Sequence, residues 1–246
     1  MNYNHHYRSA KTLSWLVIAA LAVVGICEMI AGLIGIAQIT DPGRKLGSGA
    51  GELASNSIWL VLQGVLALLQ FPVYILSIVL FLVWLFRIYK NLPSLRSAST
   101  EFTPGWAVGW WFIPFANLVK PFQVVRSAWS ESDPNFDPQT GFLTSVQAGA
   151  PAFMSLWWAF WILSNIAANI TSKVYDPDKG GGVQFSGYFF ILTGILSVAA
   201  AAFAIKVVMD ITERQDQRFK NIGLVTLSEP PPPPIFVGQN PWENSQ

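Results

Sequence analysis

Four long apolar stretches constrain the fold of this chain: residues 13–37, 58–86, 148–170 and 187–209. A helix needs about 20 apolar residues to cross roughly 30 Å of bilayer hydrocarbon, so each stretch is long enough to span a membrane. Hydrocarbon offers no water to backbone N–H and C=O groups, and a helix satisfies those groups internally. The sequence therefore predicts an all-α, polytopic membrane protein with four transmembrane helices in a single domain, residues 1–222.

The composition supports a membrane protein and argues against several functions. Hydrophobic residues make up 52% of the 246 residues and charged residues 12%, about half the charge of a soluble protein. A net charge of +1 predicts no nucleic-acid partner. Cys27 is the single cysteine, and His5 and His6 are adjacent without a cysteine or acidic cluster. We therefore expect no disulfide, no metal site, no cofactor and no catalytic histidine.

A fifth apolar run, residues 106–119, is too short for a span and contains Pro114 and Asn117. Proline removes a backbone donor and interrupts a helix, and unsatisfied backbone is costly in hydrocarbon. We predict a re-entrant or interfacial helix pair over residues 102–130 that breaks near Pro114.

The distribution of Lys and Arg predicts the orientation, because these residues accumulate in cytoplasmic loops. With both termini inside the cell, eleven lie on the cytoplasmic side and four in the outer loops. Residues 210–221 are polar and are expected to continue the fourth helix into the cytosol. Residues 223–246 include five consecutive prolines at 230–234 and are predicted to be disordered, available to a cytoplasmic protein partner.

A family becomes recognisable in the segment that follows the second span. It reads FLVWLFRIYKNLPSL from residue 81 and FTPGWAVGWWFIPFANLVKPFQVVRSAWSESDP from residue 102. This pattern resembles the DUF4328 family of bacterial membrane proteins. The matching residues are Trp84, Arg87, Asn91, Leu92, Pro104, Gly105, Trp106, Gly109, Trp110, Trp111, Pro114, Asn117, Lys120, Pro121, Arg126, Trp129, Asp133 and Pro134. Ser127 and Ala128 depart from it, where the family often has an acidic or larger residue. The resemblance implies a protein of the bacterial plasma membrane and supplies no activity.

Aromatic, basic and amide residues in this segment are candidates for lipid or ligand binding. They are Arg87, Trp106, Trp110, Trp111, Asn117, Lys120 and Arg126. One interpretation is an aromatic anchor at headgroup depth, with basic residues that set the topology. The other is an aromatic-walled pocket with a headgroup site, in which guanidinium binds phosphate bidentately. Asn91, just ahead of Pro93, is expected to cap the second helix.

Glu28 is the one acid inside a predicted span. Intramembrane acids are costly and often mark ion or proton paths. Gln70 lies at a similar depth in the second span and is the expected partner, with Gln63 second. The pair fits either a structural hydrogen bond between helices or ion handling. Small residues, including Gly25, Gly32 and Gly194, favour close packing of the first span on the fourth, or a homo-oligomer.

Three functions remain open from the sequence. The absence of a catalytic constellation favours a non-enzymatic scaffold, sensor or accessory subunit that contacts lipid headgroups and cytoplasmic partners. A small oligomeric transporter or channel would use the re-entrant segment and Glu28. A lipid-modifying enzyme ranks third. The loop offers it Glu101, Glu131, Asp133 and Asp137, of which the two aspartates resemble turn residues.

Overall fold

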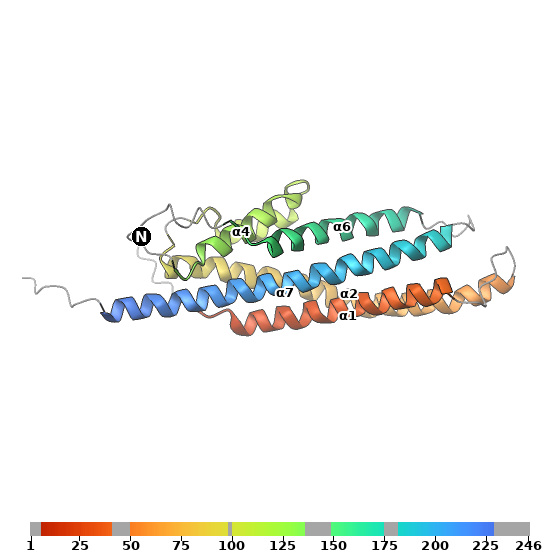
Figure 1. Ribbon diagram of the computed structural model, residues 1–246, viewed down its shortest axis with the longest axis horizontal. Helices are drawn as coiled ribbons and strands as arrows, with labels where there is room; N and C mark the ends of the chain where they lie inside the picture. The colour runs from red at the N-terminus through yellow and green to blue at the C-terminus, as the bar shows by residue number, and fades with distance from the viewer. Residues whose placement is uncertain (1–5, 41–49, 98–99, 136–148, 175–181, 229–246) are drawn as a thin grey trace, which may run out of the picture.

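The computed structural model describes residues 6–40, 50–97, 100–135, 149–174 and 182–228 (Figure 1). Four long helices dominate it: α1 (Lys11–Thr40), α2 (Ala50–Asn91), α6 (Ala152–Val174) and α7 (Gly182–Ser228). Short helices link α2 to α6: η1 (Leu92–Leu95), α3 (Pro104–Gly109), η2 (Trp110–Phe112), η3 (Ala116–Leu118) and α4 (Lys120–Glu131). The described residues contain no strand, so the predicted all-α fold is confirmed.

Four helical segments, one on each long helix and the second extending through η1, are long and apolar enough to cross a membrane. These segments are Lys11–Ala37, Val61–Leu95, Ala152–Ile170 and Ile191–Gly223, and they overlap the four predicted spans. The predicted continuation of the fourth span is also helical, because α7 extends to Ser228. Of the tail that we expect to be disordered, residues 223–228 belong to α7, and residues 229–246 with the five prolines lie outside the described residues.

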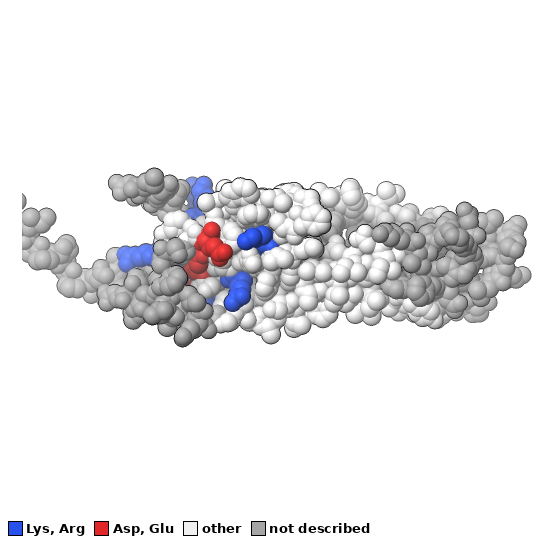
Figure 2. Space-filling model, turned by 90° about the horizontal axis from the view of Figure 1, so that it is seen from above, with Lys and Arg blue, Asp and Glu red and all other residues white. Residues whose placement is uncertain are grey.

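The outer surface of the long helices is apolar. Leu68 of α2 is 77% exposed, and Leu33, Phe71 and Ile195 are also exposed. On the described part of the face in Figure 2, the charged side chains gather at one end of the molecule. A soluble protein does not expose so large a contiguous apolar surface. The four apolar helices therefore indicate a multi-pass membrane protein.

The long helices pack in the order α2, α1, α7, α6 (Figure 1). Small residues bring α1 and α7 together: a Cβ atom at Gly25 would lie 3.6 Å from the Cβ of Ala201. A Cβ atom at Gly194 would lie 3.3 Å from the carbonyl oxygen of Glu28. The predicted packing of the first span on the fourth is therefore confirmed. Among the described residues, no comparable helix packing joins α2 to α6.

The most deeply buried core lies where the end of α2 meets α4 and α7. Its fully buried members include Trp84, Leu85, Ile88, Tyr89, Val124, Val125, Ala128, Val207, Val208 and Ile211. The Trp84 indole donates a hydrogen bond to the Thr212 hydroxyl at 3.0 Å. The Tyr89 hydroxyl donates to the Val124 carbonyl at 2.7 Å. These bonds satisfy the polar ends of two large buried aromatics.

The Trp-rich segment, residues 102–130, consists of two helical arms that meet near Pro114. The hydroxyl of Thr103 caps the first arm by accepting from the Trp106 N–H at 3.4 Å, and Pro104 suits the first helical turn. Helical structure stops after Phe112, and Phe115 has a positive φ of 64°. The helix break therefore falls at the predicted proline. The side chain of Phe115 is 87% exposed at this turn.

Candidate functional site

Glu28 and Gln70 contact each other across α1 and α2. The Gln70 amide Nε2 donates a hydrogen bond to Glu28 Oε1 at 2.6 Å. Tyr74 follows Gln70 by one helical turn, on the same side of α2. The contact between the two polar residues is the one expected from their depths in the sequence. That Glu28 and Gln70 take part in ion handling stays a prediction.

These three residues line a cavity of about 690 Å³. Its walls come from α1, α2, α6 and α7, and residues of η2 and η3 close part of one end. The cavity occupies the space where α2 and α6 do not pack along each other. Small-molecule sites in proteins usually measure about 300–1,000 Å³ and are mostly apolar with a few polar groups. This cavity has both properties.

Aromatic rings form one end of the cavity. The Trp111 ring lies 5.3 Å from the Phe81 ring of α2 and 6.4 Å from the Trp161 ring of α6, both edge to face. The Trp158 indole donates to the Leu118 carbonyl at 3.1 Å, which ties α6 to η3. The Trp-rich segment is thus held against both α2 and α6 by ring contacts and a hydrogen bond.

Two polar atoms in residues that line this cavity have no hydrogen-bond partner among the described residues. They are the indole Nε1 of Trp111 and the amide oxygen Oδ1 of Asn117, both buried. A buried donor or acceptor without a partner costs about 1–3 kcal/mol, and nearly all such groups in proteins are satisfied. Both atoms are enclosed by the surrounding side chains, so the cavity surface does not expose them.

The other sequence candidates lie outside the cavity. The Lys120 ammonium lies 5.5 Å from the centre of the Trp110 ring, within the range of a cation–π contact. Trp106 is 54% exposed and its ring lies 5.1 Å from that of Trp110. Arg126 is exposed on α4, and Arg87 is half-buried near the end of α2. The structure therefore divides the candidates: Trp111, Asn117, Glu28 and Gln70 share the cavity, and the rest do not.

A polar network at the end of the molecule that holds α4 was not foreseen from the sequence. Asn91 is the last residue of α2, but its φ of −80° and ψ of −25° are right-handed helical values, not the left-handed ones of the expected Asn cap. Its amide Nδ2 donates to the Arg8 carbonyl at 2.9 Å and to Gln215 Oε1 at 3.2 Å. Gln215 in turn donates to the Ile88 carbonyl at 3.1 Å. The Asn91 side chain thus joins the N-terminal segment to α7. The residues next to Asn91 in the sequence do not reveal this tertiary contact.

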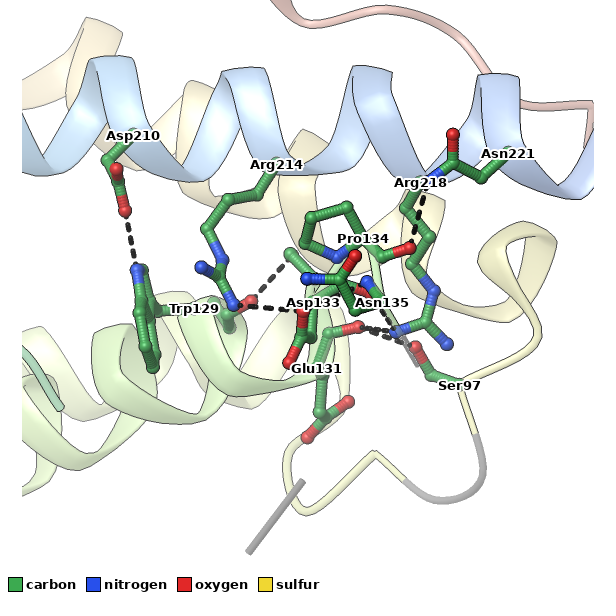
Figure 3. A network of polar contacts seen from close by, with 12 residues as sticks. Ser97, Trp129, Glu131, Asp133, Pro134, Asn135, Asp210, Arg214, Arg218 and Asn221 are labelled. Atoms are coloured by element: carbon green, nitrogen blue, oxygen red, sulfur yellow. Dashed lines mark hydrogen bonds and ion pairs between the residues drawn. The ribbon is translucent and has the colours of Figure 1, made fainter. Parts of the chain in front are cut away.

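Arg218 of α7 satisfies the carboxyl ends of two other helices (Figure 3). Its guanidinium donates to the carbonyls of Leu95 at 2.8 Å and Glu131 at 2.9 Å. It also donates to the carbonyl of Asp133 at 3.2 Å. The last carbonyls of a helix lack intrahelical partners, and a cation there also meets the negative end of the helix dipole. The residues Thr212, Gln215 and Arg218 are three apart, a polar helical stripe that could have revealed this face.

Neighbouring charges hold α4 and the N-terminal segment against α7. The Trp129 indole donates to Asp210, and Arg214 lies 3.9 Å from the Trp129 ring while pairing with Asp133 at 3.5 Å (Figure 3). On the N-terminal side, Asp216 accepts hydrogen bonds from Tyr7 and Ser9 and pairs with Lys11 at 3.3 Å. Burial, and then the bond to Asp216, raise the pKa of the Tyr7 hydroxyl.

Two of the acids that the sequence offered to an enzyme, Glu131 and Asp133, serve other contacts in this network. Glu131 accepts a hydrogen bond from Ser127 at 2.7 Å. Asp133 accepts one from the Asn135 N–H at 3.0 Å, which is the turn geometry expected of it. Asp137 lies outside the described residues. Among the residues that are described, no group of three or more His, Cys, Asp or Glu is placed to hold a metal ion.

Comparisons with known proteins place the chain in a family. A search of curated proteins and a search of solved structures each found no match. The family model described as "Domain of unknown function (DUF4328)" matches residues 50–213. That range runs from the start of α2 into α7, so it covers the Trp-rich segment and three of the four helices around the cavity, but not α1 with Glu28. The chain belongs to the DUF4328 family.

Proposed function

We propose that this protein is a non-enzymatic sensor or scaffold of the bacterial cytoplasmic membrane that binds a membrane-soluble small molecule in the cavity. The observation that carries the proposal is the cavity of about 690 Å³ between four helices of transmembrane length. Its aromatic walls and scattered polar groups match the usual lining of a ligand site.

The proposed orientation places α4, the start of α1 and the end of α7 in the cytoplasm. The excess of Lys and Arg in these segments supports it. The turn of the Trp-rich segment then lies at or below the headgroups, as a re-entrant or interfacial element. Its exposed apolar side chains support this depth; they are Phe112, Ile113, Phe115, Leu118 and Val119. Local bonds shelter its backbone, such as that from the Asn117 N–H to the Ile113 carbonyl at 2.9 Å.

Anionic lipid headgroups are the second proposed partner. Lys120, Arg126 and Arg87 belong to the segments placed at the cytoplasmic face, where a basic side chain near an anionic surface gains about 1 kcal/mol. Arg126 is the best candidate for direct contact because its side chain projects from the exposed face of α4. This contact would hold the Trp-rich segment at a fixed depth. A cytoplasmic partner would meet the adjoining network or the C-terminal tail.

A sensor requires that ligand binding in the cavity change the structure at the proposed cytoplasmic surface. Trp111 provides this connection, because it forms part of the cavity wall and belongs to the same segment as α4. The far end of α4 contacts Arg218 through the Glu131 carbonyl. A ligand that displaces the Trp111 ring would therefore move a segment bonded to the cytoplasmic end of α7.

A cavity-filling substitution tests ligand binding. Ala168 of α6 lines the cavity, whereas Ile166 is exposed on the same helix and does not. Both variants, Ala168→Trp and Ile166→Trp, and the native chain would be purified in nanodiscs and their bound small molecules measured by native mass spectrometry. We expect a bound molecule in the native chain and in Ile166→Trp, and its loss in Ala168→Trp. Equal occupancy in all three proteins, or none in any, would overturn the proposed function.

A small transporter or channel is the second candidate, because Glu28 lines the cavity at membrane depth. Proton or cation flux would be measured in liposomes that contain the native chain or Glu28→Gln. Flux that requires Glu28 would favour transport over sensing. Flux that survives the substitution would remove Glu28 from any pathway.

A further inference from the structure

We propose that the occupant of the cavity is a lipophilic organic cation whose positive charge lies against Glu28. This proposal rests on the proposed function, because it names the chemical class of the molecule that the same cavity binds. It draws on three properties of the cavity: the sign of its charge, its aromatic walls and the open side between α2 and α6.

Glu28 is the sole ionisable carboxyl lining the cavity, and no Lys, Arg or His joins it among the described residues. The one hydrogen bond recorded for its carboxyl comes from Gln70, a neutral amide. An ionised carboxylate in an apolar site is strongly disfavoured unless a counter-charge accompanies it. The protein supplies hydrogen bonding but no positive charge. A cationic ligand would provide the missing partner.

Aromatic faces supply the second half of the recognition. Tyr74, Phe81, Trp111, Trp157 and Trp161 all line the cavity. A cation over the face of an aromatic ring is attracted by the ring quadrupole, and more strongly when both are out of water. Tyr74 lies one helical turn from Gln70, whereas Phe81 lies about 16 Å from Gln70 along α2 at 1.5 Å per residue. A charge against Glu28 therefore meets Tyr74, and apolar groups that extend along the cavity reach the other rings, which selects a cation that is itself bulky and apolar. Aryl-substituted phosphonium and quaternary ammonium ions have these properties.

The same walls discriminate against the other membrane-soluble classes. An anionic lipid or fatty acid cannot pair with an ionised Glu28, because two negative charges repel each other strongly at low dielectric. A neutral acyl chain supplies no counter-charge, so the carboxyl stays protonated and contributes no ion pair to binding. The side between α2 and α6 lacks helix packing, which leaves a route for a cation dissolved in the bilayer to reach Glu28 directly.

Two ions of matched shape and opposite charge provide the test. Tetraphenylphosphonium is the cationic probe and tetraphenylborate the anionic one. Binding of each to the full chain would be measured by equilibrium dialysis, in nanodiscs of phosphatidylcholine so that the lipid carries no net charge. We expect the native chain to bind the phosphonium ion and to prefer it to the borate ion by roughly tenfold or more.

Variants then assign the preference to Glu28. Glu28→Gln keeps a side chain that can accept from Gln70, and it should remove the preference for the cation. Glu101→Gln removes an exposed acid outside the cavity, and it should leave the preference intact. Ala168→Trp should abolish binding of both ions. Melting curves of each variant would show that the fold is kept, and Glu28→Asp should keep the preference because it retains the charge.

The possible outcomes separate this proposal from the proposed function. Equal binding of both ions by the native chain, or a preference that persists in Glu28→Gln, overturns the cation proposal and leaves a cavity that binds apolar molecules. Binding of neither ion, with a bound molecule still lost in Ala168→Trp, also overturns the cation proposal alone. The absence of any molecule or probe from the native chain overturns both.

Discussion

The guanidinium of Arg218 donates a hydrogen bond from Nε to the carbonyl oxygen of Leu95 at 2.8 Å, although 123 residues separate the two in the chain. Leu95 ends the short helix that follows α2, and Arg218 belongs to the last part of α7. Because the same guanidinium also reaches the end of α4, one side chain fixes three segments relative to one another. The end of the bundle that holds α4 depends on this residue.

Replacing Arg218 is therefore expected to destabilise the protein. Arg218→Lys keeps the charge, but the ammonium group lacks the planar set of N–H donors with which the guanidinium reaches carbonyls of two helices. The loss is expected to be about 2–4 kcal/mol, because buried carbonyls lose charge-assisted hydrogen bonds. Thermal unfolding in detergent, followed by circular dichroism, measures it. The control is Lys220→Ala, at an exposed position two residues away, and an equal midpoint for both variants would contradict the role of Arg218.

Gly194 is expected to accept no large side chain. Its Cβ position lies 3.3 Å from the Glu28 carbonyl oxygen and 3.7 Å from the Cα of Gly32, so Gly194→Leu forces α1 and α7 apart and lowers the midpoint of unfolding. Gly223 lies on the same helix with open space around it. There Gly223→Ala should be neutral or stabilising, by up to about 1 kcal/mol. Similar unfolding of Gly194→Leu and the native chain would show that the helices are not packed this closely.

Glu131 predicts a dependence of stability on pH. Burial raises the pKa of its carboxyl above the ordinary value of 4.5, against the opposing effect of its bond from Ser127. The folded state therefore binds this proton more tightly than the unfolded state does. The contribution of this group to stability is fully present below the ordinary pKa and is lost as the pH rises through the higher folded pKa.

Glu131→Gln should remove the loss of stability that occurs as the pH rises. The variant is expected to be more stable than the native chain near pH 7 and to show a flatter profile of unfolding midpoint between about pH 4.5 and pH 7.5. Glu213→Gln, an exposed position on α7, serves as the matched control. A profile for Glu131→Gln as steep as that of the native chain would assign the pH dependence to other groups.

The depth of the Trp-rich turn can be measured with a cysteine at Phe115. In a Cys27→Ser background, Phe115→Cys should react slowly with a membrane-impermeant maleimide, because the proposed depth of the turn surrounds it with lipid. Arg126→Cys, on the exposed face of α4, should react readily from the cytoplasmic side of inverted vesicles. Rapid labelling of Phe115→Cys from the periplasmic side would rule out a segment placed at the cytoplasmic face.

Much of the fold was predictable because membrane constraints act locally. The length of each apolar stretch gave the four helices, and Pro114 indicated where the fifth run breaks. The contact between Glu28 and Gln70 was also predictable, since two polar residues at a similar depth in neighbouring spans gain by meeting. Small residues in the first and fourth spans indicated how α1 and α7 pack.

The cavity and the polar network were not predictable in the same way. The cavity exists because α2 and α6 lie at opposite ends of the helix order, and hydropathy carries no information about which helices are neighbours. Arg218 and Asn91 act on partners about eighty to one hundred and twenty residues distant. The local pattern around Asn91 predicted a helix cap, and a tertiary contact with Gln215 prevailed.

The continuity of α7 has a mechanical consequence. The helix runs without interruption from Thr193 at the cavity to Arg218 in the network, about 37 Å at 1.5 Å per residue. A rigid rod of that length acts as a lever, so a tilt of about 5° at the membrane end displaces the far end by roughly 3 Å. That displacement is larger than the range of donor–acceptor distances over which a hydrogen bond persists. A sub-ångström adjustment around a bound molecule would thus be magnified into the making or breaking of contacts at the far end of α7.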